Sequence, residues 1–312
     1  MVETIRTVLA LSQLPRVGRV KLRQILIRLT SSGNEELSLP DIITRLQLSE
    51  FSLADLDSAL ARADIVLDTC QSLGVSVHAF GSSSYPSQLN RLSEPPALLF
   101  SIGQFDPNRK PRVAVIGTRK PTPWGTKTAK ACAAQIADAG GVVVSGLALG
   151  IDAVAQTASV EHQGPTWAVL AHGLHTVSPS SNRELAKQIV EHGGALISEY
   201  PPGESAQRHY FVERDRIQAG LADAVLVIES GIDGGAMHTV RFAQQARVPV
   251  WVTFPNTKLN TTNARDLPEP QQGTWELLRA NTATRVPSVK TLDKMVREIA
   301  NAQPVPDTLF SR

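Results

Sequence analysis

The stretch 113-VAVIGTRKPT-122 decides the fold, because four apolar residues are followed directly by a glycine and then by two basic residues. The same pattern of a short apolar run, small residues and a segment of helical length returns along the chain. Strands that are apolar on both faces and alternate with helices are typical of a parallel sheet covered on both sides. The predicted strands are residues 113–116, 142–144, 167–170, 195–197, 224–228 and 248–252.

The segments between these runs have the length of helices, and we predict helices over 126–139, 152–162, 183–192, 212–221 and 238–247. The fold class that follows is α/β, with a doubly wound, mostly parallel sheet. Functional sites in such sheets lie beyond the carboxyl ends of the strands, where the loops gather.

A different pattern precedes the sheet. Leu22, Ile25, Leu26 and Leu29 follow helical spacing, and a second helix is predicted over residues 53–73. The break at 14-LPRVG-18 separates two helices. We therefore expect a small all-helical domain at 1–78, the α/β domain at 79–262 with its connecting region and a short strand at 97–100, and a helical extension at 263–312 with short helices at 275–278 and 292–299.

Composition excludes several classes of protein. The 312 residues are 42% hydrophobic and 19% charged, which is globular. Two distant cysteines, Cys70 and Cys132, exclude a disulfide framework and a cysteine zinc site. No apolar run approaches the ~18 residues of a membrane span, and charge interrupts the N-terminus too early for a signal peptide. We expect a cytoplasmic protein with no membrane partner.

Three loops at predicted strand ends are rich in small residues: 117–120, 145–152 and 229–236. Glycines let backbone amides approach a ligand, and a helix that starts there adds partial positive charge. Together the loops predict a site for an anion that is long or has several phosphates. Glycine is also common in tight turns that bind nothing, and that interpretation stays open. The candidates here are Gly117, Thr118, Ser145, Gly146, Gly150, Gly234 and Gly235.

Basic residues cluster around these loops. Residues 109–130 hold seven Lys or Arg, among them Arg119 and Lys120, and no Asp or Glu. A second cluster, Arg208, Arg214 and Arg216, surrounds two aromatic residues. Arginines interleaved with aromatics suit single-stranded nucleic acid, because bases stack on rings while guanidinium groups take the phosphates. Tyr210 and Phe211 are the candidates for base stacking, with core packing as the alternative for each.

Several enzyme classes are not supported. The first strand lacks the G-x-G-x-x-G of a nicotinamide enzyme, residues 125–128 do not have P-loop spacing, and no G-x-S-x-G is present. His172 and His175 lack the helical spacing of a zinc pair, so no metal site is predicted. Asp152 follows a glycine loop at a helix start, and we interpret it either as a catalytic acid or as the helix N-cap.

Four motifs in order resemble one known family. Residues 113–122 are similar to its VAIVGSRKAT, residues 144–152 (VSGLALGID) to VSGLARGID, residues 214–221 (RDRIQAGL) to RNRIIAGL, and residues 227–236 to VVEA…SGS. The family is DprA/Smf, the DNA-processing proteins of natural transformation. The resemblance spans about residues 8–255, and it includes 14-LPRVG-18, similar to the family's SAM or helix-hairpin-helix-like N-terminal part.

The resemblance implies a Rossmann-like fold and a binder that is not an enzyme and has no cofactor. Members bind and protect single-stranded DNA, dimerise through the Rossmann-like domain and load RecA in transformation and recombination. By resemblance, the phosphate contacts are Gly117, Thr118, Arg119, Ser145, Gly146, Gly150 and Arg214. The charge pattern and the third loop add Lys120, Arg216, Gly234 and Gly235.

Departures from the family pattern predict weaker phosphate binding, because each removes a donor or adds negative charge. They are Leu149 for arginine, Gln156 for histidine, Asp215 for asparagine, and Gly234 and Ala236 for serines. Two alternatives therefore remain. One is a nucleotide binder or LOG-like phosphoribohydrolase on the related fold, although Val240 or Arg241 occupies its catalytic glutamate position. The other is a diverged scaffold that does not bind DNA.

Overall fold

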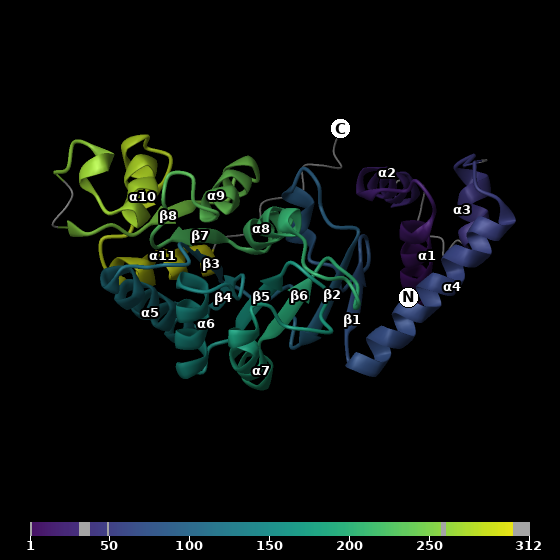
Figure 1. Cartoon of the computed structure of the whole chain (residues 1–312), viewed down its shortest axis with the longest axis horizontal. Helices are drawn as coiled ribbons and strands as arrows, with labels where there is room; N and C mark the ends of the chain where they lie inside the picture. The colour runs from purple at the N-terminus through teal and green to yellow at the C-terminus, as the bar shows by residue number, and fades with distance from the viewer. Residues whose placement is uncertain (1, 31–37, 49, 257–259, 302–312) are drawn as a thin grey trace.

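The structure is a computed structural model that describes residues 2–30, 38–48, 50–256 and 260–301. The described residues form one nine-stranded sheet in the order β1-β2-β6-β5-β4-β3-β7-β8-β9 (Figure 1). The β1–β2 and β2–β6 pairs are antiparallel and all other pairs are parallel, which confirms the predicted fold class. The strands are β1 Ser76–Ala79, β2 Leu98–Gly103, β3 Arg112–Ile116, β4 Val142–Ser145, β5 Thr166–Leu170, β6 Ala195–Ser198, β7 Ala224–Val227, β8 Val250–Val252 and β9 Thr284–Arg285.

Helices cover both faces of the sheet (Figure 1). Successive side chains of β3 point to opposite faces. Val113 and Val115 pack with α5 (Pro123–Asp138), α6 (Ile151–Glu161) and α11 (Val289–Asn301). Ala114 and Ile116 pack instead with α8 (Arg208–Leu221) and α9 (Ala236–Gln245). This double burial is the physical reason why the strand is an unbroken apolar run.

The predicted elements appear with shifted ends. The six predicted strands are β3 to β8, and the expected short strand is β2. Helix α8 begins at Arg208, four residues before its predicted start, because its first turn is polar and aromatic and carries no apolar periodicity. Helix α10 (Glu269–Arg279) begins inside a stretch that we expected to be irregular up to residue 273. The remaining helix between strands is α7 (Arg183–Glu191).

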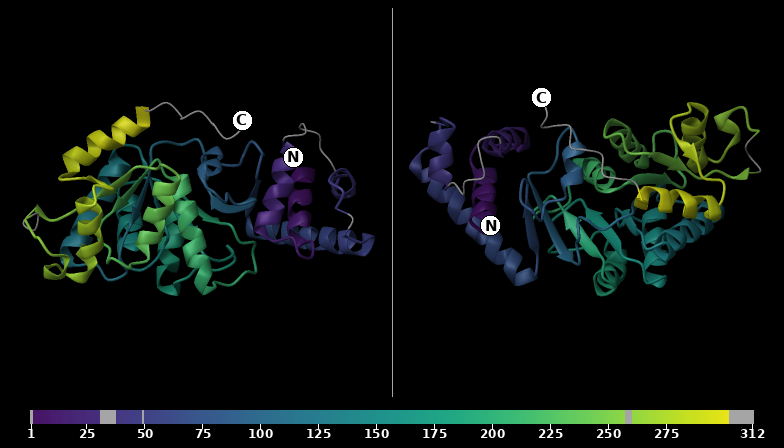
Figure 2. Two further views of the ribbon diagram at one scale, coloured as in Figure 1. Left: turned by 90° about the horizontal axis from the view of Figure 1, so that it is seen from above. Right: turned by 180° about the vertical axis from the view of Figure 1, so that it is seen from behind.

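Four helices form the N-terminal region: α1 Val2–Gln13, α2 Arg19–Thr30, α3 Leu39–Arg45 and α4 Leu53–Leu73. Ser52 and Asp55 form a reciprocal capping box at the start of α4, and Gly74 ends the helix with a φ of 65°. The helices lie beside β1 at one end of the sheet, opposite α11 (Figure 2). Their apolar core continues into the sheet through Ala79 and Phe100. The expected divisions at residues 78 and 262 stay predictions.

The order of the strands creates a crevice. From β3 the chain builds β4, β5 and β6 on one side and then returns to place β7 on the other side. Loops diverge at such a switch point, and ligands of open α/β sheets bind there. None of the helices in the described part of the chain combines the length and the apolar character needed to cross a membrane.

Candidate functional site

A cavity of about 940 Å³ lies at the switch point, at the carboxyl ends of β3, β4 and β7 and against α8. It is lined by the loops that follow β3 and β7, by α8 and by the start of α10. The predicted site residues that line it are Gly117, Thr118, Arg119, Lys120, Phe211, Arg214, Gly234 and Gly235.

The loop after β3 is held in place by contacts with the start of α6 and with Glu229. A Cβ at Gly117 would lie 2.6 Å from the Ile151 side chain and 2.8 Å from the Glu229 carbonyl oxygen, so only glycine fits there. The Thr118 amide donates to that carbonyl at 2.7 Å. The buried Glu229 carboxylate accepts from the backbone N–H and the hydroxyl of Thr122, at 2.8 and 2.7 Å. The loop is therefore fixed before any ligand arrives.

Three exposed cations border the cavity, and we call Arg119, Lys120 and Arg208 the basic rim. The Arg119 guanidinium lies 5.7 Å from the centroid of the Phe211 ring. No ion pair is recorded for these three side chains within the described ranges. Their charges are available to a ligand, and the half-buried Phe211 ring lies beside them.

The floor of the cavity has the opposite character. Arg214 is 5% exposed, donates from Nη1 to the Val169 carbonyl at 2.7 Å, and has its Nε 3.2 Å from Asp215 Oδ1. Its guanidinium passes so close to Gly146 that a Cβ there would lie 1.7 Å from Nη1. Asp152, also buried, accepts from the Gly146 amide at 3.0 Å. We call Asp152 and Asp215 the acidic floor.

Burial shifts the titration of this floor. Burial raises the pKa of Asp152, and the Arg214 charge opposes the rise. Burial also raises the pKa of Asp215 to about 7; the Asp152 charge adds to the rise, and Arg214 and Arg119 oppose it. The charge of the floor therefore changes close to neutral pH.

The loop after β4 reaches the cavity only through Ala148 and Asp152, and its other residues support the site from behind. Ser145 is buried and donates to the Val115 carbonyl, and Gly146 donates to Asp152. Gly150 packs against the backbone of Thr118 and Arg119. The structure does not bring Ser145, Gly146 and Gly150 to the cavity surface. Gly150 is also the N-cap of α6, so the N-cap interpretation of Asp152 is wrong, because its carboxylate binds the loop amide instead.

Two other candidates point away from the cavity. Arg216 donates to the Glu94 carbonyl at 2.6 Å and to the Glu199 carboxylate. The Tyr210 ring is stacked on Tyr200, with centroids 3.9 Å apart. The structure thus separates Arg216 and Tyr210 from Arg214 and Phe211, their near neighbours on α8.

Other residues reach the cavity that the site prediction lacked. Arg208 was part of the basic cluster around the aromatics, and that cluster was the signal for it. His238 follows the third glycine loop on α9. Glu269 comes from the start of α10, with its carboxylate against Gly231. Nothing in the irregular composition before residue 273 signalled this approach. The described residues contain no group of three or more His, Cys, Asp or Glu able to hold a metal ion.

Comparison with known proteins adds independent findings. A family model described as DNA recombination-mediator protein A matches residues 76–298. Protein Smf of Synechocystis is 37% identical over 177 residues, which are 55% of this chain and 44% of that protein. DNA processing protein DprA of Bacillus subtilis is 32% identical over 199 residues, 63% of this chain and 67% of that protein. The chain spans about half the length of several curated relatives it matches.

Two solved structures share the architecture. DNA processing protein A from Streptococcus pneumoniae superposes with a TM-score of 0.71 at 25% identity, over 92% of this chain and 94% of that one. DNA processing protein A from Helicobacter pylori, whose structure concerns its mode of binding single-stranded DNA, gives a TM-score of 0.62 at 26% identity, over 73% and 97%.

Proposed function

Because the chain belongs to the DNA recombination-mediator protein A family, the DprA/Smf proteins, we propose that it binds single-stranded DNA in the switch-point cavity. The observation that carries this proposal is the basic rim. Arg119, Lys120 and Arg208 keep their charges exposed around a cavity that a half-buried aromatic ring also lines. The Helicobacter pylori relative binds single-stranded DNA, which supports the same class of ligand.

The basic rim suits the phosphate of a nucleotide, and the Phe211 ring beside it suits the base. A guanidinium group binds a phosphate through two parallel hydrogen bonds, which Arg119 and Arg208 can provide. A nucleobase stacks on an aromatic ring or on a guanidinium plane, and Phe211 and Arg119 present both. In a duplex the bases are paired and stacked inside the helix. The site therefore favours a single strand.

The wider role that we propose follows the family. The protein would protect incoming single-stranded DNA and load RecA on it during natural transformation and recombination, as a homodimer and without catalysis. A dimer would present two cavities to one strand, and linking two sites raises the avidity for a long ligand.

Binding of a labelled oligo-dT to the full chain tests the proposal, measured by fluorescence anisotropy over a range of salt concentrations. We expect much weaker binding of the matched duplex, and a slope of log K against log salt of about −2, since each of three phosphate contacts to a single strand contributes roughly 0.7. Adenosine monophosphate is the comparison ligand. Binding of the mononucleotide without binding of the oligonucleotide would favour the phosphoribohydrolase alternative, and binding of neither would favour a scaffold.

A further inference from the structure

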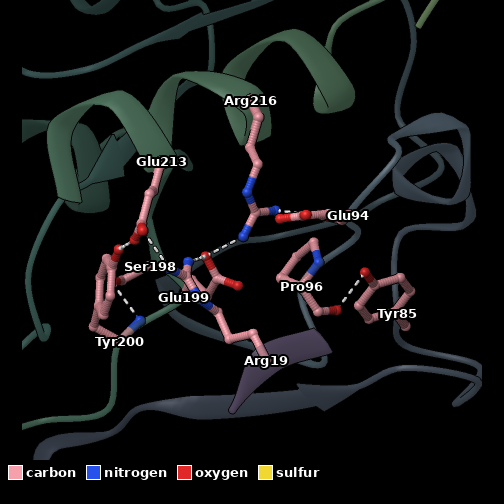
Figure 3. Close-up of polar contacts among 9 residues, drawn as sticks. All are labelled: Arg19, Tyr85, Glu94, Pro96, Ser198, Glu199, Tyr200, Glu213 and Arg216. Carbon is pink, nitrogen blue, oxygen red and sulfur yellow. Dashed lines mark hydrogen bonds and ion pairs between the residues drawn. The ribbon is translucent and has the colours of Figure 1, made fainter. Parts of the chain in front are cut away.

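Helix α2 reaches across to the sheet part of the molecule through its first turns. Arg19, the first residue of α2, donates from Nη2 to the Glu213 carboxylate on α8 (Figure 3). Its Nη1 lies 3.5 Å from the Glu199 carboxylate, just beyond the end of β6. One turn further along α2, Arg23 donates to the Ser93 carbonyl. After the break at 14-LPRVG-18, the start of α2 therefore contacts α8 through Arg19 and the segment before β2 through Arg23.

The carboxylates that receive Arg19 are each shared with a second donor. Glu199 also accepts from Arg216, and both of these side chains are 8% exposed. Glu213 also accepts from the Tyr200 hydroxyl at 2.6 Å. Two arginines and two glutamates therefore form a charge-balanced network that joins α2, α8 and the segment after β6 (Figure 3). Hydrogen bonds between charged groups are stronger than neutral ones, so these shared contacts hold the three segments together.

The same network fixes the beginning of α8. The Tyr200 hydroxyl donates to Glu213, and the Tyr200 ring stacks on the Tyr210 ring. Phe211 and Arg214 lie on the same turns of α8 as Tyr210 and Glu213, but line the cavity. Helix turns are rigid, so a displacement of Glu213 carries Phe211 and Arg214 with it.

We propose that Arg19 is a positioning residue for the DNA site, acting through Glu213 to hold the first turns of α8 where Phe211 and Arg214 face the cavity. The proposal rests on the proposed function. Arg19 is 49% exposed and does not line the cavity, so its influence passes through α8 and not through a phosphate. Exposed ion pairs contribute little to global stability, so its loss loosens this helix start without unfolding the chain.

The test compares Arg19→Ala with Lys21→Ala in the full chain. Lys21 is the matched control, because it lies on the same helix and pairs with Glu50 inside the helical region. For Arg19→Ala we expect about threefold weaker binding of oligo-dT with an unchanged salt slope, because no phosphate contact is lost. We also expect faster hydrogen exchange of the amides of residues 208–214. Lys21→Ala should change none of these quantities.

A charge swap sharpens the result. Arg19→Glu alone should weaken binding further, and the double variant Arg19→Glu with Glu213→Arg should recover at least half of the loss. A reduced salt slope for Arg19→Ala would show a direct phosphate contact and overturn the positioning role. Unchanged affinity and unchanged exchange would overturn it as well. If the unmodified chain binds no single-stranded DNA, the proposed function fails, and the exchange rates of α8 still decide the role of Arg19. Arg19→Gln replaces Arg19→Ala if the melting temperature of the alanine variant falls by several degrees.

Discussion

The two arginines of the basic rim and the two buried arginines of α8 use the same side chain in opposite ways. Arg119 and Arg208 are exposed, border the cavity, and have no recorded ion pair in the described part of the chain. Arg214 and Arg216 are buried, and each is committed to a backbone carbonyl and a neighbouring carboxylate. The rim arginines can exchange bound water for a phosphate. Arg214 and Arg216 cannot move to a ligand, because each would leave a buried carboxylate without its partner.

This difference shows that an arginine cluster in a sequence does not by itself locate a phosphate site. Arg208, Arg214 and Arg216 lie within nine positions on one helix, yet they differ in burial and in partners. Removal of an exposed cation should change binding and leave stability unchanged. Removal of a buried, paired cation should do the reverse.

The largest effect is expected for Arg216→Ala. It leaves the Glu199 carboxylate buried beside only the more distant Arg19 and leaves the Glu94 carbonyl without its donor. Breaking a buried pair by removing one partner costs about 3 kcal/mol or more. Urea unfolding of the full chain measures the loss in the free energy of unfolding. Arg109→Ala, an exposed arginine outside the cavity lining, is the control and should change it by less than about 0.5 kcal/mol.

Arg119→Ala should instead act on binding. The guanidinium borders the cavity, so its loss removes a charge-assisted contact of about 1.5–3 kcal/mol, or tenfold or more in the dissociation constant for oligo-dT. The salt slope should fall by roughly 0.7. Anisotropy titrations at several salt concentrations give both numbers. A lower melting temperature with an unchanged salt slope would show that Arg119 has a structural role, and would contradict the distinction between exposed binding arginines and buried structural ones.

The acidic floor predicts a pH dependence of binding. Burial raises the pKa of Asp215 to about 7, so Asp215 gains its proton as the pH falls from 8 to 6. Protonation removes a negative charge beside the ligand, and we expect affinity for oligo-dT to rise about fivefold over this range. Asp215→Asn should bind tightly at both pH values, with most of the dependence gone.

The same shift affects stability with a defined sign. The folded-state pKa of Asp215 lies above its unfolded value of about 3.9, so the folded chain holds the extra proton between these two values. The contribution of Asp215 to the free energy of unfolding therefore falls as the pH rises from about 4 to about 7. Asp215→Asn should flatten this part of the curve. An unchanged curve would show that Asp215 titrates normally.

The sequence predicted the sheet well because each core strand is buried on both faces. Double burial of β3 leaves an unbroken apolar run that needs no tertiary information to detect. The loops that follow β3 and β7 were also predictable, because their glycines mark close approaches of the backbone. The start of α8 was not predictable, because residues 208–211 have no apolar periodicity. Their position depends on a contact from a distant part of the chain, the stacking of Tyr210 on Tyr200.

The composition of the site was only partly predictable for a similar reason. Residue type placed Arg216 and Tyr210 with Arg214 and Phe211, but the direction of each side chain on α8 depends on the partner that meets it. Glu199 accepts a hydrogen bond from Arg216, and the Tyr200 ring stacks on Tyr210. Both partners come from the segment after β6, and neither carries a local signal of that contact. Glu269 reaches the cavity from α10 in the same unsignalled way.

The smallest effect is expected from adding a charge to the rim. Leu149 is 48% exposed and lies between Ala148, which lines the cavity, and Gly150, which packs against Arg119. Leu149→Arg would place a fourth cation beside the basic rim without filling buried space. We expect about threefold tighter binding of oligo-dT and a salt slope steeper by roughly 0.7, with the melting temperature unchanged. Leu149→Gln is the control for removal of the apolar side chain without an added charge, and it should leave the salt slope unchanged. If both variants bind alike, position 149 lies off the path of the strand, and the rim ends at Arg119.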